Sequence, residues 1–93
     1  MLTKIGPNAV RSTIGFTVSL VGRSKIVYTE GDKTLTVSAE MLVGNIDFVI
    51  YTKLIKSWAA PFSSESIDAD EKERIIKNIC DAFDFMGITY ELD

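Results

Sequence analysis

SIDADEKERIIKNICDAFDFMGITYELD, residues 66–93, combines the signal of a helix with the signal of a strand, and it decides the fold. Asp68 suits the N-cap position, where its carboxylate can accept a hydrogen bond from a free backbone N–H. Glu71, three residues later, completes a capping box, and the helix dipole favours acidic residues in the first turn. At about 100° of rotation per residue, one stripe of the helix collects apolar residues: Ile75, Ile76, Ile79, Cys80, Ala82, Phe83 and Met86. The stretch therefore predicts an amphipathic helix that packs on a core.

The same stretch predicts how the helix ends. Gly87 stands where many helices end in a left-handed residue, and Ile88 is then placed to contact Phe83. Over residues 88–92, apolar residues alternate with polar ones, which is the two-residue period of a half-buried strand. We therefore expect the helix to end near Met86 and the chain to return to a sheet.

Upstream of this stretch, period-two patterns predict further strands. They lie at residues 13–20, 25–30 and 33–41, with a short edge strand at residues 2–5. In the strand at 13–20, we expect Ile14 and every second residue after it on the buried face.

The loops between these strands predict their register. Gly31-Asp32 is a two-residue hairpin loop, and closing it pairs Tyr28 with Leu35 on one apolar face. For the preceding hairpin, a three-residue loop at 22–24 is preferred because it aligns Val18 with Tyr28.

The rest of the chain completes the predicted architecture. Residues 46–51 are apolar on both sides, which favours a central strand, and Thr52 can then cap a short helix over Lys53 to Trp58 with Leu54 facing inward. The element order predicts an α+β fold: an antiparallel sheet of about five to six strands, with a short helix and one long C-terminal helix on one face, and the last strand C-terminal. The length predicts a single domain over residues 1–93.

Composition excludes several classes of function. The chain has no histidine, which rules out imidazole bases, histidine–zinc sites and histidine-dependent triads. The lone Cys80 cannot form an internal disulfide, and no apolar run is long enough to span a bilayer. We therefore expect a cytoplasmic protein that is not an enzyme, is not in a membrane and has no metal or cofactor.

Charge is distributed unevenly along the chain. Residues 1–56 contain seven Lys/Arg and four Asp/Glu, whereas residues 57–93 contain three and nine. An acidic half disfavours direct binding to nucleic acid and favours a basic protein partner. The alternative is that each half is simply a solvated surface.

Two acidic residues near the end of the predicted helix are candidates for partner binding. Asp81 and Asp84 stand where the helix dipole disfavours negative charge. Lys77 is a poorly oriented partner for Asp81, and Asp84 has no opposite charge three or four residues away. Phe85 lies on the same outer side of the helix, and an aromatic beside unpaired carboxylates is typical of an interface with a basic partner. Alternatively, the chain entering the last strand covers Phe85.

Other candidates lie outside the helix. Trp58 and Phe62 flank Pro61 and could form an aromatic recognition surface; the alternative is that both pack over the end of the sheet. Glu91, in the acidic last strand, is assigned to the same partner surface as Asp84.

The C-terminal half resembles a known family. The residues that carry the resemblance are Asp47-Phe48-Val49-Ile50-Tyr51, Ile55, Trp58, Pro61, Ile67, Glu71, Arg74-Ile75-Ile76, Ile79 and Gly87-Ile88. In this pattern the chain resembles the small immunity proteins of bacterial polymorphic-toxin systems, in particular the family numbered seventy-four. Residues 1–20 lie outside the resemblance.

The resemblance implies a cytoplasmic protein that is made beside a toxin domain and neutralises it by binding. The expected mechanism is occlusion, in which an acidic, partly aromatic surface covers a basic active-site cleft. A nuclease from a contact-dependent, type VI or other polymorphic toxin system would suit such a surface. A secretion chaperone or adaptor, which would hold its partner on a sheet face or edge, is the alternative.

Overall fold

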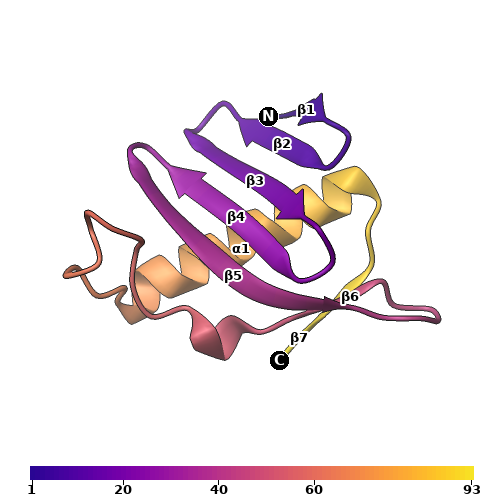
Figure 1. Cartoon of the computed structure of the whole chain (residues 1–93). Helices are drawn as coiled ribbons and strands as arrows, with labels where there is room; N and C mark the ends of the chain where they lie inside the picture. Colours follow the sequence, from indigo (N-terminus) through magenta and orange to yellow (C-terminus); the bar gives the residue numbers. More distant parts are fainter.

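Seven strands form one sheet, and strands that are adjacent in the chain are adjacent in the sheet (Figure 1). A computed structural model describes residues 1–93. The strands are β1 (Leu2–Gly6), β2 (Ala9–Ser12), β3 (Phe16–Val21), β4 (Lys25–Glu30), β5 (Lys33–Met41), β6 (Phe48–Ile50) and β7 (Tyr90–Leu92). Between β6 and β7 come one turn of 3-10 helix, η1 (Thr52–Leu54), and one α-helix, α1 (Ala69–Met86).

The sheet is mixed, so the prediction of an antiparallel sheet of five to six strands is wrong. Strands β1 to β6 are antiparallel to their neighbours, whereas β7 runs parallel to β6. A long crossover through η1 and α1 joins β6 to β7, and a connection of that kind, unlike a hairpin, returns the chain in the same direction. Strand β2 was not predicted. Val10 is its one large apolar residue, so its sequence shows no alternation of apolar and polar residues long enough to indicate a strand.

The first predicted long strand starts later than expected. Strand β3 begins at Phe16, and Ile14 is exposed rather than buried. The chain turns after β2 because the Ser12 hydroxyl accepts a hydrogen bond from the Ile14 N–H at 3.1 Å, and Gly15 adopts a positive φ of 108°. This turn separates two strands where the sequence pattern indicated one.

The predicted helix over residues 53–58 is also wrong, because only the single turn of η1 forms. Leu54 is 58% exposed rather than inward, whereas Ile55 and Trp58 reach the core from irregular backbone. Ser57 forms an isolated antiparallel bridge with Ser66, which holds the two ends of the loop before α1 together.

Other predictions from local sequence are confirmed. Val18 pairs with Tyr28, which in turn pairs with Leu35, as the two loop lengths require. The carboxylate of Asp68 accepts the N–H of Glu71 at 2.8 Å, so the helix starts where the capping signal placed it.

The end of α1 follows the predicted pattern as well. Gly87 takes the left-handed conformation with φ 73°, and the N–H of Ile88 donates to the carbonyl of Phe83 at 3.0 Å. This is the hydrogen bond of a Schellman motif. Neither helix combines the length and apolar character that a membrane crossing requires.

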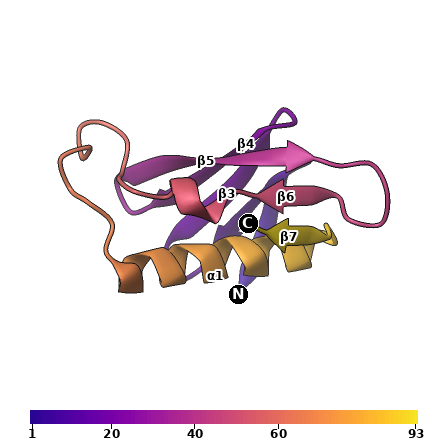
Figure 2. The ribbon, with the colours of Figure 1, turned by 90° about the horizontal axis from the view of Figure 1, so that it is seen from below.

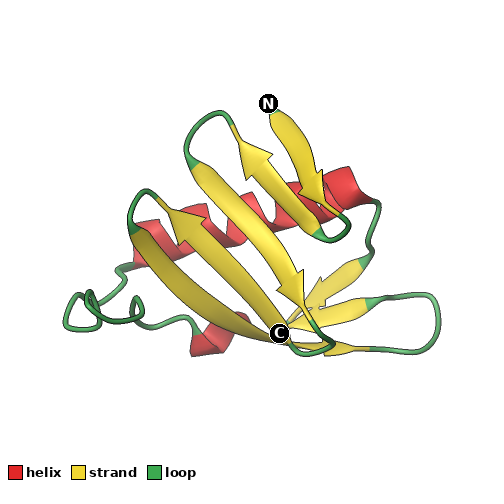
Figure 3. Cartoon of the chain, turned by 45° about the horizontal axis from the view of Figure 1, so that its top comes forward, coloured by secondary structure: helices red, strands yellow, loops and turns green.

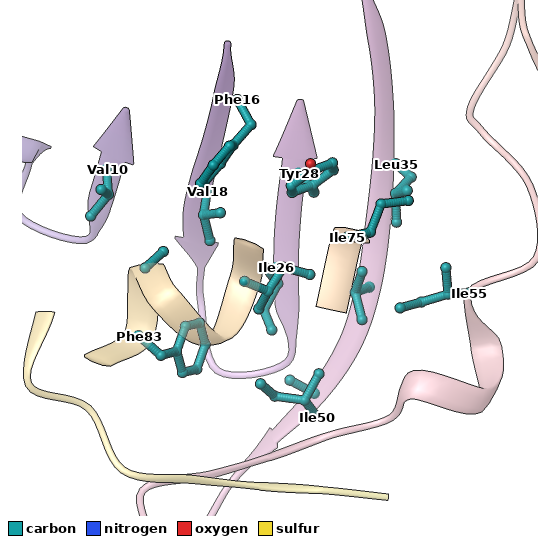
Figure 4. Close-up of a cluster of buried hydrophobic side chains, with 14 of the residues drawn as sticks. Val10, Phe16, Val18, Ile26, Tyr28, Leu35, Ile50, Ile55, Ile75 and Phe83 are labelled. Atoms are coloured by element: carbon teal, nitrogen blue, oxygen red, sulfur yellow. The ribbon is translucent and has the colours of Figure 1, made fainter. Parts of the chain in front are cut away.

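The core lies between α1 and one face of the sheet, as Figure 2 shows from the side. It contains 16 buried apolar residues, most of which are drawn in Figure 4. Two aromatic groups organise it: Tyr28 stacks between Phe16 and Trp58, with ring centroids 5.9 and 6.3 Å away, and Phe83 meets Phe48 and Tyr90 edge-on. Figure 3 shows the strands crossing α1, with no helix on the other face of the sheet.

A polar network joins α1 to β4 inside this arrangement. The Tyr28 hydroxyl accepts a hydrogen bond from Asn78 Nδ2 at 2.9 Å and donates one to Glu30 Oε1 at 2.7 Å. Arg74 of α1 donates two further hydrogen bonds to Glu30, at 3.1 and 2.7 Å. Burial opposes ionisation of Glu30, but the hydrogen bonds from Arg74 and Tyr28 outweigh it and lower the pKa of this carboxyl group.

Candidate functional site

The C-terminal half of α1 presents the first part of the candidate site. Phe85 is 51% exposed, although it is a large apolar side chain. Asp84 is exposed and takes part in no ion pair, whereas Asp81 pairs with Lys77 at 3.0 Å. The helix therefore brings one carboxylate without an ion-pair partner and one half-exposed aromatic together at adjacent positions.

Negative charge at this end of α1 also affects the side chains beneath it. Burial raises the pKa of the Cys80 thiol, and the carboxylates of Asp84 and Asp81 raise it further. Burial likewise raises the pKa of Tyr90, with contributions from Cys80 and Asp84. Cys80 is therefore a neutral thiol at neutral pH and lacks the thiolate character of a nucleophile.

Glu91 lies on the other face of the sheet from Asp84. Its neighbour Tyr90 faces α1, where its ring lies 5.6 Å from that of Phe83, and successive strand residues point to opposite faces. The sheet register places Glu91 opposite Val49, which is opposite Glu40. Glu91 therefore belongs to a row of residues across β5, β6 and β7, on the face without a helix.

Sequence reasoning missed Glu40 and Tyr51 in this second group. The Tyr51 hydroxyl donates a hydrogen bond to Glu40 Oε2 at 2.9 Å, which raises the pKa of Tyr51. The alternation of β5 and β6 indicates which residues of each strand share a face. It does not give the register between the two strands, because the loop that joins them has no hairpin signature in its sequence. Glu40 and Glu91 are both exposed and free of ion pairs.

Trp58 does not belong to an exposed surface. Its side chain is 2% exposed and stacks on Tyr28, and the Lys33 ammonium lies 5.8 Å from its ring. Phe62 is partly buried against the same core, with the Lys33 ammonium 5.4 Å from its ring. Both rings therefore pack at the end of the sheet, which is the second of the two alternatives that the sequence left open for them.

The loop between β5 and β6 contains the other exposed apolar residues near these acids. Val43 is fully exposed, at 105%, and Met41 is 48% exposed. Met41 is the last residue of β5, and we define residues 42–47 as the β5–β6 loop that follows it. Its Gly44-Asn45 sequence is typical of a turn, but no sequence signal distinguishes the exposed apolar residues beside it from buried ones.

The comparisons with known proteins identify a family for most of this structure. The family model described as immunity protein 74 matches residues 18–93, which include β4 to β7, α1 and residues 18–21 of β3. Strands β1 and β2 precede the matched region. No curated protein and no solved structure matches the chain.

Proposed function

Since the chain belongs to the immunity protein 74 family, we propose that it binds a cognate bacterial toxin and neutralises it by covering the active site of the toxin. The family match over residues 18–93 is the observation that carries the proposal. Inhibition by coverage needs a complementary surface and no reaction by the chain itself. The proposal places the complex in the cytoplasm, where newly made toxin would be captured.

The exposed end of α1 supports this mechanism. Phe85 exposes half of its side chain beside Asp84, whose carboxylate has no cationic partner. Aromatic residues are enriched at protein interfaces, where they remove a large apolar area from water. An unpaired carboxylate at the rim of the contact would pair with a basic group of the toxin.

The charge of the chain suits a nuclease as the toxin. Residues 57–93 contain nine Asp/Glu and three Lys/Arg. A nuclease must bind a phosphate backbone and so exposes a basic cleft. Charge complementarity would speed association with such a cleft, and buried aromatic contacts would slow dissociation. The delivery system of the toxin would be contact-dependent, type VI or another polymorphic system.

Co-expression with the polypeptide encoded immediately upstream tests the proposal. That polypeptide alone is expected to abolish growth, and co-expression with this chain is expected to restore it. The purified pair should form a complex whose association slows as salt concentration rises. Growth that stays abolished although the chain saturates the toxin would refute the proposed function, as would full toxin activity in the purified complex.

A secretion chaperone or adaptor is the second candidate. The sheet face without a helix and the unpaired edges of β1 and β7 support it, because an extended partner segment could bind there. An adaptor would bind the upstream polypeptide without changing its effect on growth. Binding without protection would therefore favour the adaptor over the immunity function.

A further inference from the structure

The β5–β6 loop projects from the end of the molecule where α1 ends, as Figures 1 and 2 both show. Val43 in this loop is fully exposed, at 105%, and does not pack against the core. Met41, at the base of the loop, leaves 48% of its surface in water. Exposed apolar side chains do not stabilise the fold, and where several lie close together they mark an interaction surface.

The β5–β6 loop also has a distinctive charge pattern. Residues 41–46 carry no charge, and the residues on either side of them, Glu40 and Asp47, are both acidic and free of ion pairs. Arg23 is the basic residue beside the loop, where its carbonyl accepts the N–H of Met41 at 3.2 Å. A complementary partner would therefore offer an apolar depression with cationic groups at its rim.

Hydrogen bonds fix the base of the loop to the segment before β7. The Asp47 N–H donates to the Thr89 hydroxyl at 3.0 Å, and the Thr89 N–H donates to the Asp47 carboxylate at 3.1 Å. The Thr89 hydroxyl also lies 3.2 Å from the carbonyl of Asn45, and the Leu42 N–H donates to the carbonyl of Asp47 at 2.8 Å. These bonds hold the loop in a defined shape, which lowers the entropy lost when it binds.

The position of the loop makes it continuous with the surface already described. The segment from residue 87 to residue 89 connects the end of α1, with Asp84 and Phe85, to the hydrogen bonds that hold the loop. The end of α1 and the β5–β6 loop lie at the same end of the molecule (Figure 2). One protein partner can therefore contact both elements.

We propose that the β5–β6 loop inserts Val43 into an apolar pocket of the cognate toxin, with Asp47 facing cationic groups at the rim of that pocket. This inference rests on the proposed function and names the contact through which it operates. The loop supplies the convex apolar part of the interface, and the end of α1 supplies its acidic part.

Binding of purified variants to the toxin domain encoded immediately upstream tests the loop. Val43→Asp is expected to weaken the affinity by about tenfold or more, because it would place a charge in an apolar pocket. The matched control is Leu54→Asp, at another apolar side chain that is more than half exposed. The control is expected to keep its affinity within about threefold of wild type, and both variants should keep their melting temperatures.

A second variant tests the contribution of the fixed loop shape. Thr89→Val removes the side-chain hydrogen bonds to Asp47 and Asn45 without altering an exposed apolar residue. The expected result is a reduction in affinity smaller than that of Val43→Asp, because the variant loop must be ordered on binding.

Equal binding by wild type and both loop variants would overturn the loop proposal and leave the immunity function intact. Failure of the wild type itself to bind and protect would instead overturn the proposed function. A wild-type dimer that Val43→Asp dissociates would show that a second copy occupies the loop, and would also overturn the proposal.

Discussion

Truncation of Phe85 to alanine separates a binding role from a folding role. Phe85 is the one aromatic residue that α1 leaves half exposed, and its neighbour Asp84 has no ion-pair partner. If the proposed interface covers this side chain, Phe85→Ala should weaken toxin binding and leave the fold almost unchanged.

The magnitude follows from the exposed area. An aromatic side chain offers roughly 150–250 Å² in total, and Phe85 leaves 51% of its surface exposed, so roughly 100 Å² remains to be buried by a partner. At about 25 cal/mol per Å², that area corresponds to about 2.5 kcal/mol as an upper bound. Since ordering of the interface reduces this value, we expect a loss of about 1–2.5 kcal/mol, which is roughly a 5-fold to 70-fold rise in Kd.

The stability of the variant should change by less than about 1 kcal/mol, because the exposed half of the ring contributes little to folding and alanine favours the helix. Titration calorimetry with the upstream toxin domain measures the binding loss, and thermal denaturation measures the stability. Leu54→Ala is the control, since Leu54 is 58% exposed and lies on η1 rather than on α1. A marked fall in the melting temperature of Phe85→Ala would assign the ring to the core, and an unchanged Kd would refute the role of this surface.

Three further predictions concern charge and the buried polar network. Asp84→Lys should weaken toxin binding by about 1–2 kcal/mol and reduce the salt dependence of the association rate, which stopped-flow measurements at two salt concentrations can detect; an unchanged rate would remove Asp84 from the interface. Asn78→Ala should lower the free energy of unfolding by about 1–3 kcal/mol in urea denaturation, because it deletes the buried hydrogen bond to the Tyr28 hydroxyl; a loss below about 0.5 kcal/mol would show that this bond adds little. Because the pKa of Glu30 is lower in the folded state, its ionisation stabilises the fold at pH values above the unfolded pKa of about 4.3, and this stabilisation is lost as the pH falls through the folded value. Glu30→Gln should therefore flatten the acidic side of the stability profile, and a profile parallel to that of wild type would contradict this assignment.

Local sequence signals predicted the elements whose determinants are close in the chain. The N-cap of α1 depends on Asp68 and a residue three positions away, and its end depends on Gly87. The registers of the β3–β4 and β4–β5 hairpins follow from loop length and alternation over fewer than ten residues on each side. These signals therefore suffice without knowledge of the rest of the fold.

Other features depend on contacts between distant parts of the chain. The direction of β7 relative to β6 is set by the path of the crossover over the core, which the alternation of five residues at 88–92 cannot specify. Trp58 is buried because Tyr28, in a distant strand, provides a stacking partner. Pro61, three residues after Trp58, does not indicate whether the tryptophan is buried or exposed.

The candidate site shows the same division. Asp84 and Phe85 were proposed as candidates from their positions on a helix, which is a local criterion, and the structure leaves both of them exposed. Glu91 was assigned to the surface of Asp84, but the alternation of β7 turns it to the opposite face, in one row with Glu40 and with Val49 between them. The exposure of Val43 could not be predicted, since the apolar run at residues 41–43 is equally compatible with the end of a buried strand and with a loop.

The parallel pairing of β6 with β7 has a consequence for biosynthesis. Strands β1 to β5 form successive hairpins, whose contacts are local and fast to make. Strand β6, in contrast, acquires its second neighbour only after residues 90–92 have left the ribosome, almost forty residues later. Until then Phe48 lacks the aromatic cluster of Phe83 and Tyr90 around it. The nascent chain therefore completes its core only after β7 has been synthesised, and under the proposed function protection can begin only after that point.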